Sequence, residues 1–132
     1  MRTAHKPGMK AKLANSGPIY AGRGRMRNAF FDFRKLKHLG KNVIIGEYVR
    51  IRRPEQVVIG DCTILDDFTY ISTHLEVGRF VHIASNTVIV GGDGQCVYED
   101  FAGSSPGCTI ITCSDDFVGG LACPQIPRRF KG

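Results

Sequence analysis

The side chains best suited to move a proton near neutral pH are the chain's four histidines, because an unperturbed imidazole has a pKa of about 6.5. His5 lies in a basic leader and His38 in a segment with helix-end signals, so both are interpreted as solvated surface residues. His74 and His82 lie in a periodic segment, and His82 is the last residue of its repeat, at a corner that leads into Ile83. The residues alone leave both as candidates for a general base. A surface or interface histidine is the alternative.

Metal and disulfide chemistry have less support. A catalytic zinc site takes three protein ligands, whereas the periodic segment offers only His74 and His82, eight positions apart. No metal is therefore expected. The five cysteines are odd in number and form no CxxC motif, which favours a reduced, cytoplasmic setting.

An apolar residue recurs at every sixth position through the middle of the chain. The members of this series are Ile59, Leu65, Ile71, Val77, Ile83 and Ile89. A helix repeats at 3.6 residues and an ordinary strand at 2.0, so a period of six fits neither alone. Short fixed repeats of this kind are typical of a parallel β-helix, in which short strands alternate with tight turns. The alternative, an antiparallel β-sandwich with chance spacing, is less consistent with so regular a series.

Two insertions interrupt the period without ending it. Residues 52–56 separate Ile51 from Ile59, and residues 91–94, which include three glycines, separate Ile89 from Tyr98. The second insertion is turn-forming, and we expect it to protrude and to contribute to an acceptor pocket or a subunit contact. The period then resumes and continues to about residue 117, which predicts about four coils.

The remaining segments divide the chain. Residues 1–27 contain seven Lys or Arg and no acid, so the net charge of +6 comes from this stretch. It is predicted to be a flexible arm that is solvated or packs on a neighbouring subunit, and its charge is also compatible with binding a polyanion. Residues 28–40 are predicted to form a short capping helix from Asp32 to Gly40, residues 41–117 the β-helix, and residues 118–132 a loop or tail.

The repeats resemble a known family. Ile59-Gly60-Asp61-Cys62-Thr63-Ile64 and Val77-Gly78-Arg79-Phe80-Val81-His82 are similar to the hexapeptide motif of left-handed β-helix acyltransferases. The stretch from Gly78 to Phe117 resembles the sugar O-acyltransferases of that superfamily. The resemblance implies an all-β, left-handed parallel β-helix with three faces and about eighteen residues per coil. It also implies a homotrimer with sites between subunits, which transfers acetyl from acetyl-CoA to a hydroxyl or amine of a sugar or nucleotide-sugar acceptor.

The same resemblance suggests roles for single residues. His82 corresponds to a histidine assigned to proton abstraction or to contact with the acetyl group. Carboxylates that could orient its ring are Asp115 and Asp116, or Glu99 and Asp100. For the acetyl-CoA site, Asn86 is a candidate donor, and the backbone N–H groups of Gly103 and Gly107 are candidates for the oxyanion site. The residues alone do not choose among these options. Outward apolar residues such as Phe68, Tyr70 and Phe80 suggest a buried subunit face.

The repeat ends after Asp116, whereas the resembling enzymes continue through several further coils that hold much of the CoA. A second hypothesis is therefore a non-catalytic, truncated β-helix scaffold that trimerises without binding CoA. A third is a basic-armed binding module. No apolar run of eighteen residues occurs in the sequence, so no membrane span is expected.

Overall fold

The chain folds as three parallel sheets of four strands each. The structure is a computed structural model that describes residues 28–115, 118, 125, 127 and 129. The predicted arm, Asp116 and most of the predicted tail lie outside the described residues. Sheet A consists of β1 (His38–Leu39), β4 (Val57–Ile59), β7 (His74–Val77) and β10 (Gln95–Tyr98). Sheet B consists of β2 (Ile44–Ile45), β5 (Ile64–Leu65), β8 (His82–Ile83) and β11 (Gly103–Ser104). Sheet C consists of β3 (Arg50–Ile51), β6 (Tyr70–Ile71), β9 (Val88–Val90) and β12 (Thr109–Ile111).

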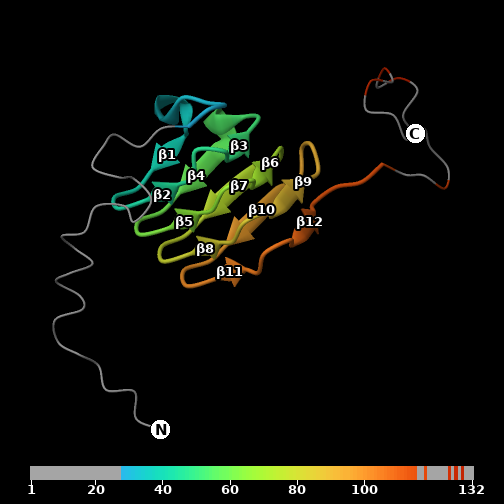
Figure 1. Cartoon of the computed structure of the whole chain (residues 1–132). Coiled ribbons are helices and arrows are strands. Elements are labelled where there is room, and N and C mark those ends of the chain that lie inside the picture. The colour runs from blue at the N-terminus through green and yellow to red at the C-terminus, as the bar shows by residue number, and fades with distance from the viewer. Residues whose placement is uncertain (1–27, 116–117, 119–124, 126, 128, 130–132) are drawn as a thin grey trace, which may run out of the picture.

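Every strand pairs in parallel with the strand three places later in the chain. β2 pairs with β5, β5 with β8 and β8 with β11, and the other two sheets follow the same rule. The chain therefore visits sheets A, B and C in turn and rises by one coil each time, so that successive strands of one sheet lie side by side (Figure 1). This arrangement confirms the predicted parallel β-helix of about four coils. None of the described helices is long and apolar enough to cross a membrane.

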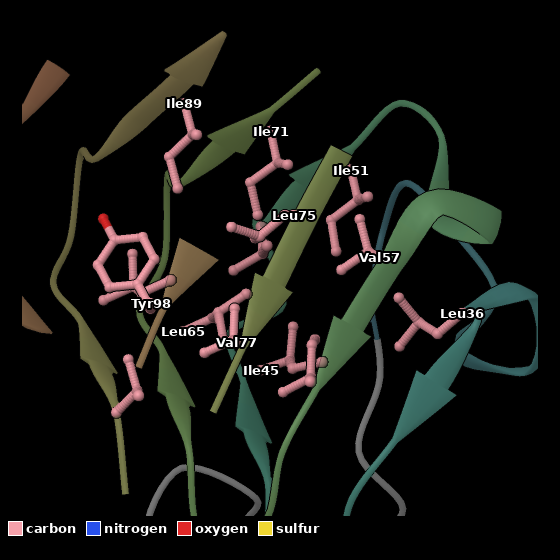
Figure 2. Packing of buried hydrophobic residues seen from close by; sticks show 14 of the residues in the cluster. Leu36, Ile45, Ile51, Val57, Leu65, Ile71, Leu75, Val77, Ile89 and Tyr98 are labelled. Carbon is pink, nitrogen blue, oxygen red and sulfur yellow. The ribbon is translucent and has the colours of Figure 1, made fainter. Parts of the chain in front are cut away.

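The period of six is the spacing of the inward side chains. Leu65 pairs in register with Ile83, and Ile71 with Ile89, and all four are fully buried. Figure 2 shows these aliphatic side chains gathered inside the coils. Burial of each such side chain contributes about 1.5–3 kcal/mol, so this stack is the main source of stability in the solenoid.

Small residues occupy the inside of the corners because two strands meet there at close range. Thr63, Thr69 and Thr87 are all buried. The hydroxyl of Thr63 donates to the backbone oxygen of Gly78 at 2.9 Å, and thereby ties one coil to the next. In the sequence, a small residue follows most of the core residues by four places, as Thr63 follows Ile59. In the structure, these small residues lie at the corners of the coils.

The outside of each corner requires an unusual backbone. At the corner between sheets A and B, the residues with left-handed φ are Asn42, Cys62, Phe80 and Phe101, with φ of 54–66°. At the corner between sheets B and C, the residues with positive φ are Phe68, Asn86 and Gly107. Asn and Gly adopt this region at low cost, whereas phenylalanine does not.

The predicted capping helix over 28–40 is wrong in its extent. The only helical turn in this segment is the 3₁₀ turn η1 (Phe33–Lys35). Asp32 is its N-cap as predicted, since the carboxylate accepts from the N–H of Arg34 at 2.9 Å. The helix does not continue because Leu36 is buried under the first coil and His38–Leu39 pair with β4 as strand β1. Sheet pairing therefore outweighs the helical signals in this segment.

Both insertions lie at the corner between sheets C and A. The first contains the 3₁₀ turn η2 (Pro54–Gln56), and the second is the loop 91–94. The Arg53 guanidinium joins them, because Nη2 donates to the backbone oxygens of Ser72 (2.9 Å) and Gly92 (2.6 Å). Loop 91–94 is thus hydrogen-bonded through Arg53 to the first insertion, and its part in an acceptor pocket or a subunit contact stays a prediction.

Candidate active site on sheet B

His82 and Asp66 form an ion-pair-type contact on the outer face of sheet B. The Nε2 atom of His82 lies 2.8 Å from Oδ2 of Asp66. Strand β8 carries His82, and Asp66 directly follows β5, the strand one coil earlier. Because Leu65 and Ile83 point into the core, the residues on either side of them point outward. The fold therefore places the imidazole and the carboxylate diagonally across two neighbouring strands.

The contact determines which ring nitrogen can act as a base. An ionised carboxylate only accepts hydrogen bonds, so Nε2 carries the proton that is shared with Asp66. In the neutral ring this leaves the lone pair of Nδ1 free to accept a proton. The His82 side chain is 56% exposed and that of Asp66 is 23% exposed. The pair is accessible to a substrate, and its carboxylate is partly withdrawn from water.

Gly103 brings the backbone of strand β11 close to that of His82. In sheet B, His82 pairs with Ile64 on one side and with Gly103 on the other. A Cβ atom at residue 103 would lie 2.9 Å from the backbone oxygen of His82. The N–H groups of Ile64 and His82 both donate to the next coil. By the same pattern, the N–H of Gly103 on β11, the last described strand of sheet B, points away from the described coils. This orientation suits the predicted oxyanion donor.

The other residues predicted for the acetyl-CoA site lie elsewhere. The N–H of Gly107 donates to the backbone oxygen of Ser85 at 3.0 Å, so it has no proton left for an oxyanion. Asn86 is exposed at the corner between sheets B and C, where its N–H donates to the backbone oxygen of Asp67. That position accounts for an asparagine through the turn alone.

The carboxylates predicted to orient His82 are not those that the structure places there. Asp100 binds the Arg79 guanidinium at 2.6 Å and 3.0 Å and accepts from the N–H of Arg79 at 2.7 Å. The side-chain hydrogen bonds from Arg79 lower the pKa of Asp100. Glu99 is its exposed neighbour, Asp115 follows β12, and Asp116 lies outside the described residues. Among the described residues, the carboxylate that contacts His82 is Asp66.

A signal for Asp66 was present in the sequence. Leu65 and Ile83 are eighteen positions apart, which is one coil without insertion. Residues 64–66 therefore lie beneath residues 82–84, and Asp66 is the acidic residue among them. The sequence prediction considered only acids nearer the end of the repeat, namely Glu99, Asp100, Asp115 and Asp116, and therefore did not include it.

The remaining reactive residues are separate from this pair. His74 is half-buried on sheet A and His82 is on sheet B, so the two histidines lie on adjacent faces. The described residues contain no group of three or more His, Cys, Asp or Glu arranged to hold a metal ion. Burial raises the pKa of the Cys96 thiol, and the described cysteines Cys62, Cys96, Cys108 and Cys113 are unpaired with one another.

A hollow of about 470 Å³ lies at the corner opposite sheet B. It is lined by Arg52, Arg53, Ser72 and Gly92. Arg53 also forms an ion pair with Asp93 at 3.5 Å. Because this corner joins sheets C and A, loop 91–94 and the hollow cannot line a site around His82 within one chain.

The three aromatic residues expected on one subunit face do not share one. Phe68 lies at the corner between sheets B and C, stacked on Tyr48, and Tyr70 lies on sheet C. Phe80 lies at the corner between sheets A and B, stacked on Phe101. The exposed aromatic surface is therefore split between the two ends of sheet B.

Comparison with solved structures identifies two similar chains. One is the crystal structure of AntD, an N-acyltransferase from Bacillus cereus, in complex with dTDP and 3-hydroxybutyryl-CoA, with 32% identity and a TM-score of 0.69. The other is a serine-to-cysteine mutant of AntD in complex with dTDP-4-amino-4,6-dideoxyglucose and coenzyme A, with 31% identity and a TM-score of 0.69. Each match covers 80% of this chain and 59% of the other. A scan against protein-family models found no match, and a search of curated proteins found none either.

Proposed function

We propose that this chain, which has the fold of the left-handed β-helix acyltransferases, transfers an acyl group from an acyl-CoA to a nucleotide-sugar acceptor. The observation that carries the proposal is the contact between His82 and Asp66 on the open face of sheet B. The likeness to AntD supports it, since those structures contain CoA derivatives together with dTDP or a dTDP-amino sugar. The chain spans 59% of the AntD chain, so the activity of the whole neighbour is proposed for this chain and not assumed.

His82 acts in this proposal as the general base. Nδ1 takes the proton from the acceptor's amine or hydroxyl while that nitrogen or oxygen attacks the carbonyl carbon of the thioester. The carbon–sulfur bond then breaks, and the proton passes from the imidazolium to the departing sulfur. The products are an amide or an ester and free CoA. Asp66 holds the ring in one tautomer and stabilises the imidazolium between these two steps.

The N–H of Gly103 is the proposed donor to the oxyanion. It lies on the strand next to His82 and, by the pattern of the other strands of sheet B, points away from the described coils. A donor aimed at developing negative charge commonly contributes about 10²–10³ in rate.

The proposed acyl group and the proposed acceptor nucleophile are inferred by analogy with the AntD structures. Acetyl-CoA is the simplest donor and was expected from the sequence, whereas one AntD complex holds 3-hydroxybutyryl-CoA. AntD is an N-acyltransferase, which favours an amine over a hydroxyl as the nucleophile. We therefore propose an amino sugar on a nucleoside diphosphate as the acceptor class.

We also propose that the active form is a homotrimer with sites between subunits. The exposure of His82 supports this, because an acyl transfer competes with hydrolysis unless water is excluded from the base. A neighbouring copy would supply the missing wall over sheet B.

The test is product formation by the purified chain. Acetyl-CoA and 3-hydroxybutyryl-CoA are each incubated with a dTDP-amino sugar and with the matching dTDP-sugar that lacks the amine, and the products are identified by mass spectrometry. We expect an acylated amino sugar and one free CoA per turnover. A folded oligomer that yields no acylated product from either donor would overturn the proposal and favour the scaffold hypothesis.

A further inference from the structure

Two phenylalanines form an exposed column at the corner between sheets A and B. The rings of Phe80 and Phe101 are stacked, with centroids 5.2 Å apart and planes 2° from parallel. Phe80 is 51% exposed and Phe101 is 75% exposed. Phe80 precedes His82 by two residues, and Phe101 precedes Gly103 by two residues. Both rings are therefore close in the chain to the candidate base, His82, and to Gly103, which pairs with it.

The turn itself does not require these aromatic side chains. Phe80 and Phe101 have φ of 57° and 66°, a strained region for a bulky residue. Asn42 occupies the equivalent corner of the first coil, and asparagine adopts this conformation more easily. The left-handed turn therefore does not account for phenylalanine at these two positions.

The column is held rigidly by the polar residues of the same turns. Arg79 and Asp100 precede Phe80 and Phe101 by one residue, and their charged groups are joined at 2.6 Å. In addition, the N–H of Phe101 donates to the backbone oxygen of Arg79 at 2.9 Å. The two rings are therefore positioned before any ligand arrives, which lowers the entropic cost of stacking a third ring on them.

We infer that the Phe80–Phe101 column is a platform on which the nucleobase of a substrate stacks. Phe101 is 75% exposed, so much of its ring is accessible to a flat aromatic ligand. Stacking on an aromatic side chain suits any base, because every base has a π-face. The inference rests on the proposed function, in which both substrates carry a base: the adenine of acyl-CoA and the base of the nucleotide sugar.

The main competing occupant is a second copy of the chain. Two features favour a base. The two stacked rings form a flat aromatic surface, and Phe80 and Phe101 lie two residues before His82 and Gly103 in the chain.

The opposite end of sheet B offers a matched control. Tyr48 and Phe68 also form an exposed stack, with centroids 5.7 Å apart. Phe68 has φ of 64° and is 61% exposed, so it resembles Phe101 in backbone, exposure and ring contact. It lies at the other corner, away from the turn that leads to His82.

The experiment measures binding without turnover. CoA, dTDP and 4′-phosphopantetheine, which has no base, are titrated calorimetrically into the wild type, Phe101→Ala, Phe101→Tyr and Phe68→Ala, with the molar mass of each followed by light scattering. We expect Phe101→Ala to weaken either CoA or dTDP by about tenfold, while Phe101→Tyr and Phe68→Ala stay within about twofold. The affinity for 4′-phosphopantetheine is expected to be unchanged. The ligand that loses affinity identifies the source of the base.

Three results would overturn the inference. One is equal affinity of Phe101→Ala and wild type for both CoA and dTDP, and another is no binding of either by the wild type. The third is a change of molar mass in Phe101→Ala, which would make the column a subunit contact. A wild type that binds these ligands normally but forms no acylated product would contradict the proposed function and leave the platform intact.

Discussion

Asp66 and His82 are sixteen residues apart in the sequence and 2.8 Å apart in space, from Oδ2 to Nε2. The distance follows from the coil: an uninterrupted turn of the solenoid places the residue after Leu65 next to the residue before Ile83. Both side chains face outward, so the pair adds little to stability. An exposed ion pair contributes about 0–1 kcal/mol. A small contribution to stability is compatible with the proposed role of this pair in acyl transfer.

The first prediction concerns Asp66. Asp66→Asn removes the charge that stabilises the imidazolium, so kcat for acyl transfer is expected to fall about 10–100-fold with the fold retained. The control is Asp67→Asn, since the Asp67 carboxylate accepts from the N–H of Tyr48 at 2.9 Å and does not bind His82. Steady-state kinetics of the two variants decide the matter, and equal rates would remove Asp66 from the mechanism.

The second prediction concerns pH. Arg79 lowers the pKa of Asp100 in the folded chain, so the pair stabilises the fold above the unfolded pKa of about 3.9. This contribution is lost as the pH falls through the lower folded pKa. The wild type should therefore melt above Asp100→Asn at pH 6, and the two melting temperatures should converge toward pH 2. A gap that stays constant over this range would mean that the ionised pair contributes nothing.

The third prediction concerns the close packing of corners. A Cβ atom on Gly60 would lie 2.4 Å from the backbone oxygen of Gly78 in the next coil. Gly60→Ala is expected to destabilise the chain by about 2–4 kcal/mol, because backbone on both sides must move. At Gly92 a Cβ atom would meet no atom within 4 Å, although φ is +56°, so Gly92→Ala should cost only about 1 kcal/mol. Urea unfolding compares the two, and the reverse order would contradict the coil register.

The fourth prediction concerns the core. Ile71 is fully buried between neighbouring coils, and Ile71→Ala should cost about 2–5 kcal/mol. Ile111 is 63% exposed on the last described strand of sheet C, so Ile111→Ala should change stability by less than about 0.5 kcal/mol. If Ile111→Ala and Ile71→Ala lose similar amounts of stability in thermal or urea unfolding, the prediction is contradicted. The Ile111 side chain would then be covered in solution by a group outside the described residues.

The sequence was most informative where the core sets the pattern. The period of six predicted the inward residues, the four coils and the place of both insertions. Inward positions such as Leu65 and Ile83 carry this signal because a polar side chain there would disrupt the packing of the neighbouring coils. It was less informative at the first coil, where Asp32 and Gly40 have helical signals but β1 pairs with β4. Local propensity is weaker there than the hydrogen bonds that a new strand gains from an existing sheet.

Contacts between outward residues were harder to predict. The predicted base has a carboxylate partner among the described residues, and that partner is Asp66, which was not among the acids predicted to orient it. Outward residues carry no periodic signal, since solvent accepts almost any side chain. Only the alignment of one coil on the next reveals which of them meet.

The most direct test of the central claim is kcat/KM for acyl transfer by His82→Ala and His74→Ala beside the wild type. His74 is the other histidine of the coils and lies on sheet A, away from Asp66. The account predicts a fall of at least about 100-fold for His82→Ala and a change within about threefold for His74→Ala, with circular dichroism unchanged in both. Full activity in His82→Ala would contradict it.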